Sequence, residues 1–264
     1  MPTITQHAPG SFCWPELATL DAAAAKSFYM PLFGWTVVEH DMGPNGFYYI
    51  FQLGGRDAAA MFPMTPDMLE RKVPPHWGAY VSVENVDETA AKADTLGGTQ
   101  VMAPFDVGEN GRLAVFIDPI GAPINLWQGK GTPGVGVMYE HGALAWTQLN
   151  ATDPAKAKAF YEPLLGWKGN DMQSPMGGAY TQWSNAVGMA AGMMPMPPDA
   201  GGSSHWLTYF AVDDVDASHA KLTAMGGKTW VPPMDIPGVG RMTVVADPQG
   251  ATFAMAKFLP PPGA

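Results

Sequence analysis

Two stretches of the chain repeat one another and decide its architecture. Trp14-Pro15-Glu16-Leu17-Ala18-Thr19-Leu20-Asp21 is matched, 132 residues later (146 − 14), by Trp146-Thr147-Gln148-Leu149-Asn150-Ala151-Thr152-Asp153. The helix-like stretches Phe28-Tyr29-Met30-Pro31-Leu32-Phe33-Gly34-Trp35 and Phe160-Tyr161-Glu162-Pro163-Leu164-Leu165-Gly166-Trp167 keep the same offset. An internal repeat of this length indicates two copies of one folding unit.

The repeat continues to the end of each copy. The offset falls to 129 from His76-Trp77 and His205-Trp206 onward because one loop of the second copy is three residues shorter, and Asp118-Pro119-Ile120-Gly121 returns as Asp247-Pro248-Gln249-Gly250. Each copy has about 130 residues, a common size for one domain with its own core. A Gly/Pro run at 129–136 separates the copies, so we expect domains at residues 1–133 and 134–264.

Composition restricts the possible partners. The 264-residue chain carries a formal charge of −10 with only 14 Lys plus Arg, which are scattered and would not attract a phosphate backbone. No run approaches the roughly 20 apolar residues that cross a bilayer, and the N-terminus lacks the pattern of a secretory signal. Cys13 is the only cysteine, which favours a reducing cytoplasm. We expect a cytoplasmic monomer or homodimer that binds a small molecule, and neither nucleic acid nor membrane.

Each copy has the pattern of two successive βαβββ modules. Asp21 is placed to cap a helix that Gly34 ends, as Asp153 and Gly166 are in the second copy. In the first copy strands are expected at 35–39, 47–53 and 58–63, and then a strand at 76–83, a helix at about 87–96, and strands at 99–102, 113–117 and 124–128. The sequence therefore predicts an α+β fold of tandem βαβββ modules, four in all.

These four modules, with the frames D-x-x-x-x-x-x-F-Y-x-P-L-x-G-W and D-P-x-G, resemble the vicinal oxygen chelate superfamily, which includes glyoxalase I, bleomycin-resistance proteins and extradiol dioxygenases. The resemblance covers about residues 10–128 and 142–258. It implies two glyoxalase/bleomycin-resistance-like domains with curved mixed sheets, whose concave sides enclose a small molecule. In catalytic members of the superfamily a divalent metal is held there.

The resemblance also says where metal ligands would lie. The family positions fall on Trp14, Gly78 and Asn125 in the first copy and on Trp146, Leu207 and Ala254 in the second. Only the Asn125 carbonyl oxygen is even a poor ligand for a divalent cation. Strand residues two apart share a face, so Glu16, His76 and Asn125 form an alternative, displaced metal site. We expect no metal and no other cofactor, with a divalent metal ion as the alternative.

Aromatic and polar residues on the strands expected to line the two concave sides are the candidate ligand contacts. They are Trp14, Glu16, Tyr48, His76, Asn125 and Trp127 in the first copy, and Trp146, Gln148, Tyr180, His205 and Phe253 in the second.

Several other residues allow two interpretations. His76 and His205 are either polar groups of the cleft or strand-start residues bonded to the preceding loop. Arg112 and Arg241 could steer an anion, but an Asp partner such as Asp106 or Asp235 is the commoner arrangement. Trp35 and Trp167 are expected in the core, and Cys13 as a small buried residue. The Met-rich segments 61–68 and 189–196 are expected to be loops, serving either as an apolar lid or as a connection packed on the sheet edge.

The functional hypothesis is a metal-free protein that binds a small, partly aromatic molecule in one or both concave pockets. The residues leave open whether it is an enzyme. The alternative, which the resemblance supports, is a metal-dependent lyase or isomerase of the glyoxalase I type, or a hydroxylase or dioxygenase. The second copy, with Leu207 and Ala254 at ligand positions, is the one expected to have lost its site.

Overall fold

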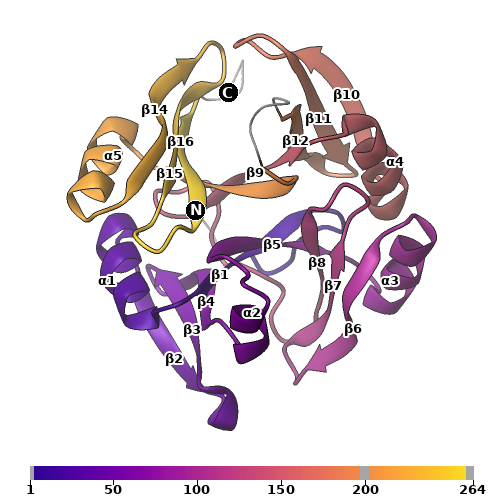
Figure 1. Cartoon of the computed structure of the whole chain (residues 1–264), viewed down its shortest axis with the longest axis horizontal. Coiled ribbons are helices and arrows are strands. Elements are labelled where there is room, and N and C mark those ends of the chain that lie inside the picture. Colours follow the sequence, from indigo (N-terminus) through magenta and orange to yellow (C-terminus); the bar gives the residue numbers. More distant parts are fainter. Residues whose placement is uncertain (1–2, 197–201, 260–264) are drawn as a thin grey trace.

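The computed structural model describes residues 3–196 and 202–259, which form two curved eight-stranded sheets (Figure 1). The first sheet has the order β2-β3-β4-β1-β5-β8-β7-β6 and the second β10-β11-β12-β9-β13-β16-β15-β14. The first comprises β1 (Phe12–Thr19), β2 (Thr36–Asp41), β3 (Phe47–Leu53), β4 (Arg56–Pro63), β5 (His76–Ser82), β6 (Thr99–Val107), β7 (Gly111–Ile117) and β8 (Pro123–Gly129). The second comprises β9 (Leu144–Ala151), β10 (Lys168–Gln173), β11 (Ala179–Asn185), β12 (Gly188–Pro195), β13 (His205–Ala211), β14 (Lys228–Ile236), β15 (Gly240–Ala246) and β16 (Thr252–Phe258).

Each sheet joins two βαβββ modules through their first strands, which confirms the predicted fold. In the first sheet β1 pairs parallel with β4 of its own module and antiparallel with β5 of the next, and β9 pairs in the same way with β12 and β13. The module helices are α1 (Ala22–Phe33), α3 (Val86–Thr95), α4 (Pro154–Leu165) and α5 (Val215–Ala224). A short helix α2 (Pro66–Glu70) and a 3-10 turn (Gly43–Asn45) lie between strands.

The predicted helix ends are confirmed. The Asp21 side chain accepts hydrogen bonds from the backbone N–H groups of Ala23 and Ala24, and Asp153 caps α4 through Lys156 N–H. Gly34 and Gly166 follow the two helices in the left-handed region, with φ of 71° and 67°. Glycine adopts this conformation without a Cβ penalty, so both helices end where the sequence predicts.

The Met-rich segments are more regular than expected. Thr65 accepts the Met68 N–H and Pro66 occupies the first turn, so that α2 forms within the first segment. The second segment is not a loop, because residues 188–195 form β12, which pairs with both β11 and β9. Its centre, residues 191–193, is buried, and Met189 and Met194 near its ends are exposed.

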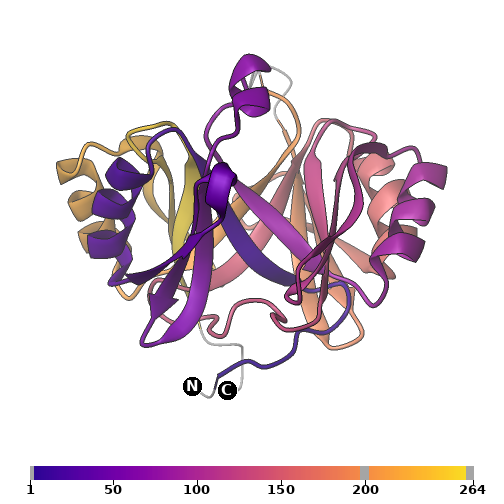
Figure 2. The ribbon, with the colours of Figure 1, turned by 90° about the horizontal axis from the view of Figure 1, so that it is seen from below.

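The two sheets pack with their convex sides together, so the halves of the chain share their cores. One hydrophobic cluster combines β5, β7 and β8 of the first sheet with α4 and β9 of the second, and another combines α1 and β3 with β13 and β16. The helices accordingly lie in two pairs on opposite flanks, α1 beside α5 and α3 beside α4 (Figures 1 and 2). The expectation of a separate core in each copy is therefore wrong.

Buried hydrogen bonds connect the repeated frames of opposite halves. Tyr29 in α1 donates its hydroxyl to Asp247 at 3.0 Å and accepts the Trp77 indole N–H at 3.1 Å. The second copy of the frame does the same, since Tyr161 donates to Asp118 at 2.8 Å and accepts from Trp206 at 3.0 Å. We call these two three-residue sets the Trp–Tyr–Asp relays.

Each relay fixes a D-P-x-G turn as well as an interface. The other carboxylate oxygen of Asp118 accepts the backbone N–H groups of Ile120 and Ala122, and Asp247 accepts those of Gln249 and Ala251. Burial raises the pKa of both Asp carboxyls, and these hydrogen bonds lower it. The two frames that repeat within the chain thus contact each other across the interface between the halves.

The indoles that follow α1 and α4 also bridge the halves. Trp35 donates to the Gly142 carbonyl and Trp167 to the Gly10 carbonyl, each at 2.8 Å, and both side chains are buried, which confirms that they belong to the core. The connecting segment 130–143 packs on the first sheet, where Val135 N–H donates to the Cys13 carbonyl at 2.8 Å. The exact boundary between residues 133 and 134 stays a prediction. No helix in the described ranges has the length and apolar character to span a membrane.

Tyr161→Phe should lower the free energy of unfolding by about 1–3 kcal/mol, because it leaves the Trp206 N–H and one Asp118 oxygen without their buried partner. Tyr29→Phe should have a similar effect. The measurement is urea unfolding, with Tyr139→Phe, whose ring is 59% exposed, as the control. Equal effects of the buried and exposed substitutions would contradict the structural role of the relays.

Candidate functional site

The concave side of the first sheet gathers most of the residues that the sequence predicts as ligand contacts. Strand alternation directs Trp14 and Glu16 of β1, Gly78 and Tyr80 of β5, and Asn125 and Trp127 of β8 to the same side. In the register Glu16 lies opposite Gly78, Trp14 opposite Tyr80, and Tyr80 opposite Asn125. Together with Tyr48 of β3, these seven residues are called the first concave face.

Glu16 is the polar centre of this face. One carboxylate oxygen accepts the Tyr48 hydroxyl at 2.6 Å, and the other accepts the Tyr80 hydroxyl at 2.5 Å. Tyr48 in turn accepts the Trp14 indole N–H at 3.2 Å. Distances of this size are typical of hydrogen bonds from a hydroxyl to an ionised carboxylate.

The environment of Glu16 disfavours its charge. The side chain is half-buried, and burial raises its carboxyl pKa, while the hydrogen bonds from Tyr48 and Tyr80 lower it. Burial and the neighbouring Glu16 charge also raise the pKa of both phenols well above its usual range. The set is therefore one carboxyl group whose two oxygens each accept a neutral hydroxyl, an arrangement that suits its ionised form.

Aromatic rings form the floor around this carboxylate. Trp14, Tyr80 and Trp127 retain only 8%, 8% and 9% of their exposure, whereas Tyr48 and Asn125 are half-buried and reach the surface. Trp127 is fixed by its indole N–H, which donates to the Thr132 carbonyl at 2.9 Å. The face thus presents a partly accessible polar group above apolar ring surface, as small-molecule sites commonly do.

Sequence reasoning missed Tyr80, although it hydrogen-bonds directly to Glu16. The alternation that connects His76 with Gly78 also reaches Tyr80, so a signal was available. His76 itself lies at the start of β5, opposite Ala18. Its Nδ1 donates to the Pro74 carbonyl at 2.8 Å, which matches the interpretation of a residue bonded to the preceding loop.

The concave side of the second sheet has the same layout with different chemistry. Trp146 donates to the Tyr180 hydroxyl at 3.2 Å, as Trp14 does to Tyr48, but Gln148 replaces Glu16 and bonds to Asn150 at 3.1 Å. Leu207, Ala254 and Ala256 replace Gly78, Asn125 and Trp127, and form an apolar cluster with Tyr209. We call this set, Trp146, Gln148, Tyr180, Leu207, Tyr209, Ala254 and Ala256, the second concave face.

A single small residue changes the position of the tyrosine on this second face. A Cβ at Gly192 would lie only 1.8 Å from the Tyr180 hydroxyl oxygen, so this hydroxyl rests directly on the main chain of β12. Ala60 occupies the matched position in the first sheet, and its methyl group leaves no such room. The hydroxyl of Tyr48 instead contacts Glu16.

Of two further predicted residues of the second face, Phe253 differs from the expectation and His205 matches one of its two interpretations. Phe253 is fully buried in the core on the convex side, against Tyr29, Phe33 and Phe210, and does not line the concave side. The prediction was wrong by one position, because Ala254 is the residue that faces the hollow. His205 Nδ1 donates to the Ser203 carbonyl at 2.9 Å, and its Nε2 accepts from Asn150 at 3.0 Å, again as a strand-start residue.

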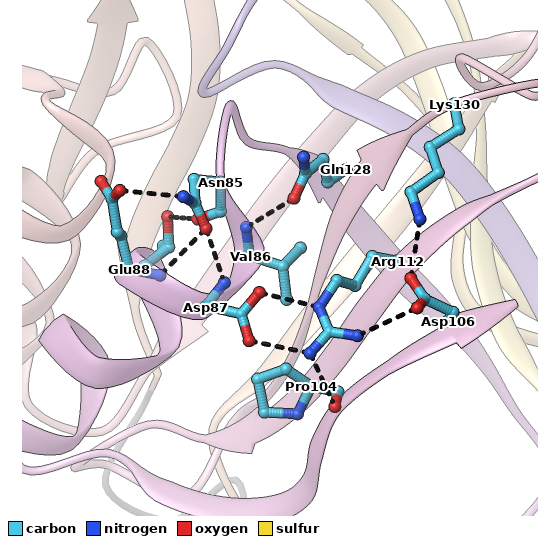
Figure 3. A network of polar contacts seen from close by, with 10 residues as sticks. Asn85, Val86, Asp87, Glu88, Pro104, Asp106, Arg112, Gln128 and Lys130 are labelled. Carbon is cyan, nitrogen blue, oxygen red and sulfur yellow. Dashed lines mark hydrogen bonds and ion pairs between the residues drawn. The ribbon is translucent and has the colours of Figure 1, made fainter.

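The two matched arginines are engaged in ion pairs with the Asp residues considered from the sequence and with further ones. Figure 3 shows Arg112 held by both oxygens of Asp87, by Asp106 and by the Pro104 carbonyl, while Lys130 binds the other side of Asp106. Arg241 binds Asp216 and Asp235 in the same way. These pairs are on the helix and hairpin side of the sheets, and neither arginine is placed to neutralise Glu16.

Two hollows on the surface lie elsewhere. One, of about 460 Å³, runs between residues 3–5, the β3–β4 turn and the connecting segment, and another, of about 140 Å³, lies beside Trp146 and the N-terminal residues 6–12. The first is lined largely by glycines and main chain, and its Arg56 is paired with Glu140. Neither gathers the converging polar and aromatic groups that the first concave face has.

Comparison with known proteins agrees with this geometry. The model of the Glyoxalase/Bleomycin resistance protein/Dioxygenase superfamily matches residues 12–126 and 143–255. The chain belongs to this superfamily. "Putative glyoxylase CFP32" of Mycobacterium bovis is 39% identical over 261 residues, covering 98% of this chain and 99% of that protein. "Anthracycline biosynthesis protein DauV" of Streptomyces sp. (strain C5) is 31% identical over 266 residues, covering 97% and 96%.

Solved structures of the superfamily share the fold at lower identity. The Mn(II)-bound glyoxalase from Novosphingobium aromaticivorans has a TM-score of 0.65 at 16% identity, over 95% of this chain and 84% of that one. A catechol 2,3-dioxygenase also has a TM-score of 0.65, at 14% identity, over 98% of this chain and 91% of that one. These two likenesses establish the common architecture of the sheets.

The residues of this superfamily member do not suit a divalent metal at the family position. Trp14 and Gly78 offer no ligand there, and Asn125 offers only an amide oxygen. Across residues 3–196 and 202–259, no three or more His, Cys, Asp or Glu side chains are grouped to hold a metal ion. The displaced set of Glu16, His76 and Asn125 contains only two side chains of these types, fewer than the three protein ligands of a usual catalytic metal site.

The stability of Glu16→Gln relative to the wild-type protein should increase as pH rises. The folded state raises the Glu16 pKa above 4.5, so the folded protein binds this proton more tightly than the unfolded chain. The wild-type protein therefore loses folding stability as pH rises from 4.5 through the folded pKa, because the buried group ionises. The uncharged amide of Glu16→Gln shows no such loss. In urea unfolding, the stability of Glu16→Gln minus that of the wild-type protein should be more positive at about pH 7.5 than at about pH 4.

The second concave face supplies the reciprocal variant. Gln148→Glu should reduce stability with the same pH dependence, because it places a carboxylate at the matched buried position, where Gln148 is 7% exposed. A Glu16→Gln effect that is independent of pH would contradict the assigned ionisation.

Proposed function

We propose that this superfamily member binds a small, partly aromatic molecule on the first concave face, without a metal ion. The observation that carries the proposal is the half-buried Glu16 carboxylate, held by Tyr48 and Tyr80 above a floor of Trp14 and Trp127. An aromatic lining of this kind favours a flat ligand through stacking and apolar burial, and the carboxylate would fix its orientation.

The difference between the two faces supports the first as the binding site. At the centre of the first face Gly78 has no side chain, and the nearest atom to a Cβ there would be the Asn125 amide nitrogen at 3.1 Å, whereas the second face has the buried Leu207 side chain at the matched position. The first face also has the amide of Asn125 and the indole of Trp127 where the second has only methyl groups. Side chains with hydrogen-bonding and stacking capacity are therefore concentrated in one half of a duplicated scaffold.

The names of relatives point to the same ligand class. DauV is named for anthracycline biosynthesis, and anthracyclines are flat fused-ring compounds of the kind that such a face could stack. The glyoxylase name of the mycobacterial relative and the metal enzymes among the solved structures support the alternative, a metal-dependent lyase or dioxygenase. That alternative requires a donor set that Trp14, Gly78 and Asn125 do not supply.

Gly78→Leu should reduce the affinity for an aromatic ligand at least about tenfold, because it reproduces in the first face the side chain that fills the second. A Cβ at Gly78 would lie 3.1 Å from the Asn125 amide nitrogen, a flexible group that can move, so the variant should fold. Binding is measured as saturable change in Trp fluorescence with a panel of fused-ring aromatic compounds.

Leu207→Gly is the matched control and should leave that affinity unchanged. If no compound gives a saturable change with the wild-type protein, the proposed function is wrong. Binding that is lost in Leu207→Gly and kept in Gly78→Leu would move the site to the second face.

Removing metal should not change ligand binding. Protein purified without chelators should contain Ni, Zn, Fe and Mn well below one equivalent by elemental analysis, and EDTA treatment should leave the fluorescence titration unchanged, because no converging donor set is present at the family position. A stoichiometric metal whose removal abolishes binding would favour the metal-dependent enzyme instead.

A further inference from the structure

The charge of Glu16 has no cationic partner in the described part of the chain. Its two hydrogen bonds come from neutral phenols, and it forms no ion pair with Lys, Arg or His. Arg112, the matched arginine of this half, is bonded to Asp87 and Asp106 instead. A half-buried carboxylate without a counter-ion is costly, and sites that keep such a group commonly use it.

The hydroxyl hydrogens of Tyr48 and Tyr80 are already used in bonds to Glu16, so toward a ligand these groups offer acceptors rather than donors. Both phenolic hydrogens point to Glu16, and the Tyr48 oxygen is already bonded to Trp14 N–H. A carboxylate oxygen can accept more than one hydrogen bond, so each oxygen of Glu16 has a lone-pair position beyond the one that a phenol occupies. The ring faces of Trp14, Tyr48, Tyr80 and Trp127 carry the negative part of an aromatic quadrupole.

From this arrangement we infer that the natural ligand carries a protonated amine beside its ring, and that the ammonium group binds Glu16 within the aromatic floor of the first concave face. The inference rests on the proposed function and adds the charge of the ligand to it. An N–H donor on a cation provides what the site lacks, namely a counter-charge and a donor for the free lone pairs. The neighbouring rings add cation–π attraction.

Other ligand charges fit less well. An anionic ligand would meet the Glu16 carboxylate and a chain with formal charge −10, with no basic side chain on the face to compensate. A neutral aromatic ligand would cover Glu16 and remove its remaining water without replacing it. The second concave face has Gln148 at this position and should show no preference for a cation.

The test compares three ligands that share one ring system: tryptamine, its neutral derivative N-acetyltryptamine, and the anion indole-3-propionate. Isothermal titration of the full-length protein at neutral pH should show tryptamine binding at least about tenfold more tightly than N-acetyltryptamine, with indole-3-propionate weakest, because only the ammonium forms a charge-assisted hydrogen bond with Glu16. Glu16→Gln should bring the affinity for tryptamine to that for N-acetyltryptamine.

Glu84→Gln, which makes the same chemical change at an exposed residue of the turn after β5, should keep the preference. Equal affinities of the wild-type protein for tryptamine and N-acetyltryptamine would overturn the inferred ligand charge and leave the aromatic site standing. Failure of all three ligands to bind would count against the proposed function itself. If Glu16→Gln does not fold, as judged by circular dichroism, the wild-type comparison alone decides the ligand charge.

Discussion

The structure depends on the two Trp–Tyr–Asp relays. Each relay places a tyrosine hydroxyl from a helix of one half between an indole of the same half and a carboxylate of the other. Buried polar groups are costly unless every donor and acceptor is satisfied, and the relays satisfy theirs only when the halves are docked. The frames F-Y and D-P-x-G are therefore the two sides of one interface, repeated with the roles of the halves exchanged.

Because the halves dock through their convex sides, the interface between them does not depend on the side chains at the centres of the concave faces. The hydrophobic clusters that hold the halves together lie on the convex side, so the side chains of the first concave face contact their own sheet. A half-buried carboxylate, an uncharged amide or an apolar side chain can occupy the centre of a concave face without disturbing the interface. The differences between Glu16 and Gln148, and between Gly78 and Leu207, follow from this independence.

The sequence predicts the modules well because each is specified locally. Helix caps, helix-ending glycines and the repeated frames place every module helix, and strand alternation brings Trp14, Glu16, Asn125 and Trp127 to one side. The prediction fails where a shift of one residue along a strand, or one distant contact, determines which way a side chain points. Phe253 is a neighbour of the correct position, and a shift of one residue on a strand reverses the face.

The pairing of Tyr29 with Asp247 could not be predicted in this way, because it joins residues 218 positions apart and depends on how the halves dock. The same limit applies to the opposing sheets, whose clusters mix both copies. No local pattern records which of two identical frames is the partner of the other. The contact of Tyr80 with Glu16 differs from these, because strand alternation on β5 already places Tyr80 on the same side as Gly78.

The reciprocal relays also bear on how a duplicated gene product diverges. Since Asp118 holds Tyr161 and Asp247 holds Tyr29, neither half can be discarded once its own recognition chemistry is gone. A half that had lost its ligand site would still be needed for folding, because it supplies the Asp that binds the tyrosine of the other half. Selection can thus preserve the contacts between both halves while the concave face of only one is kept for binding.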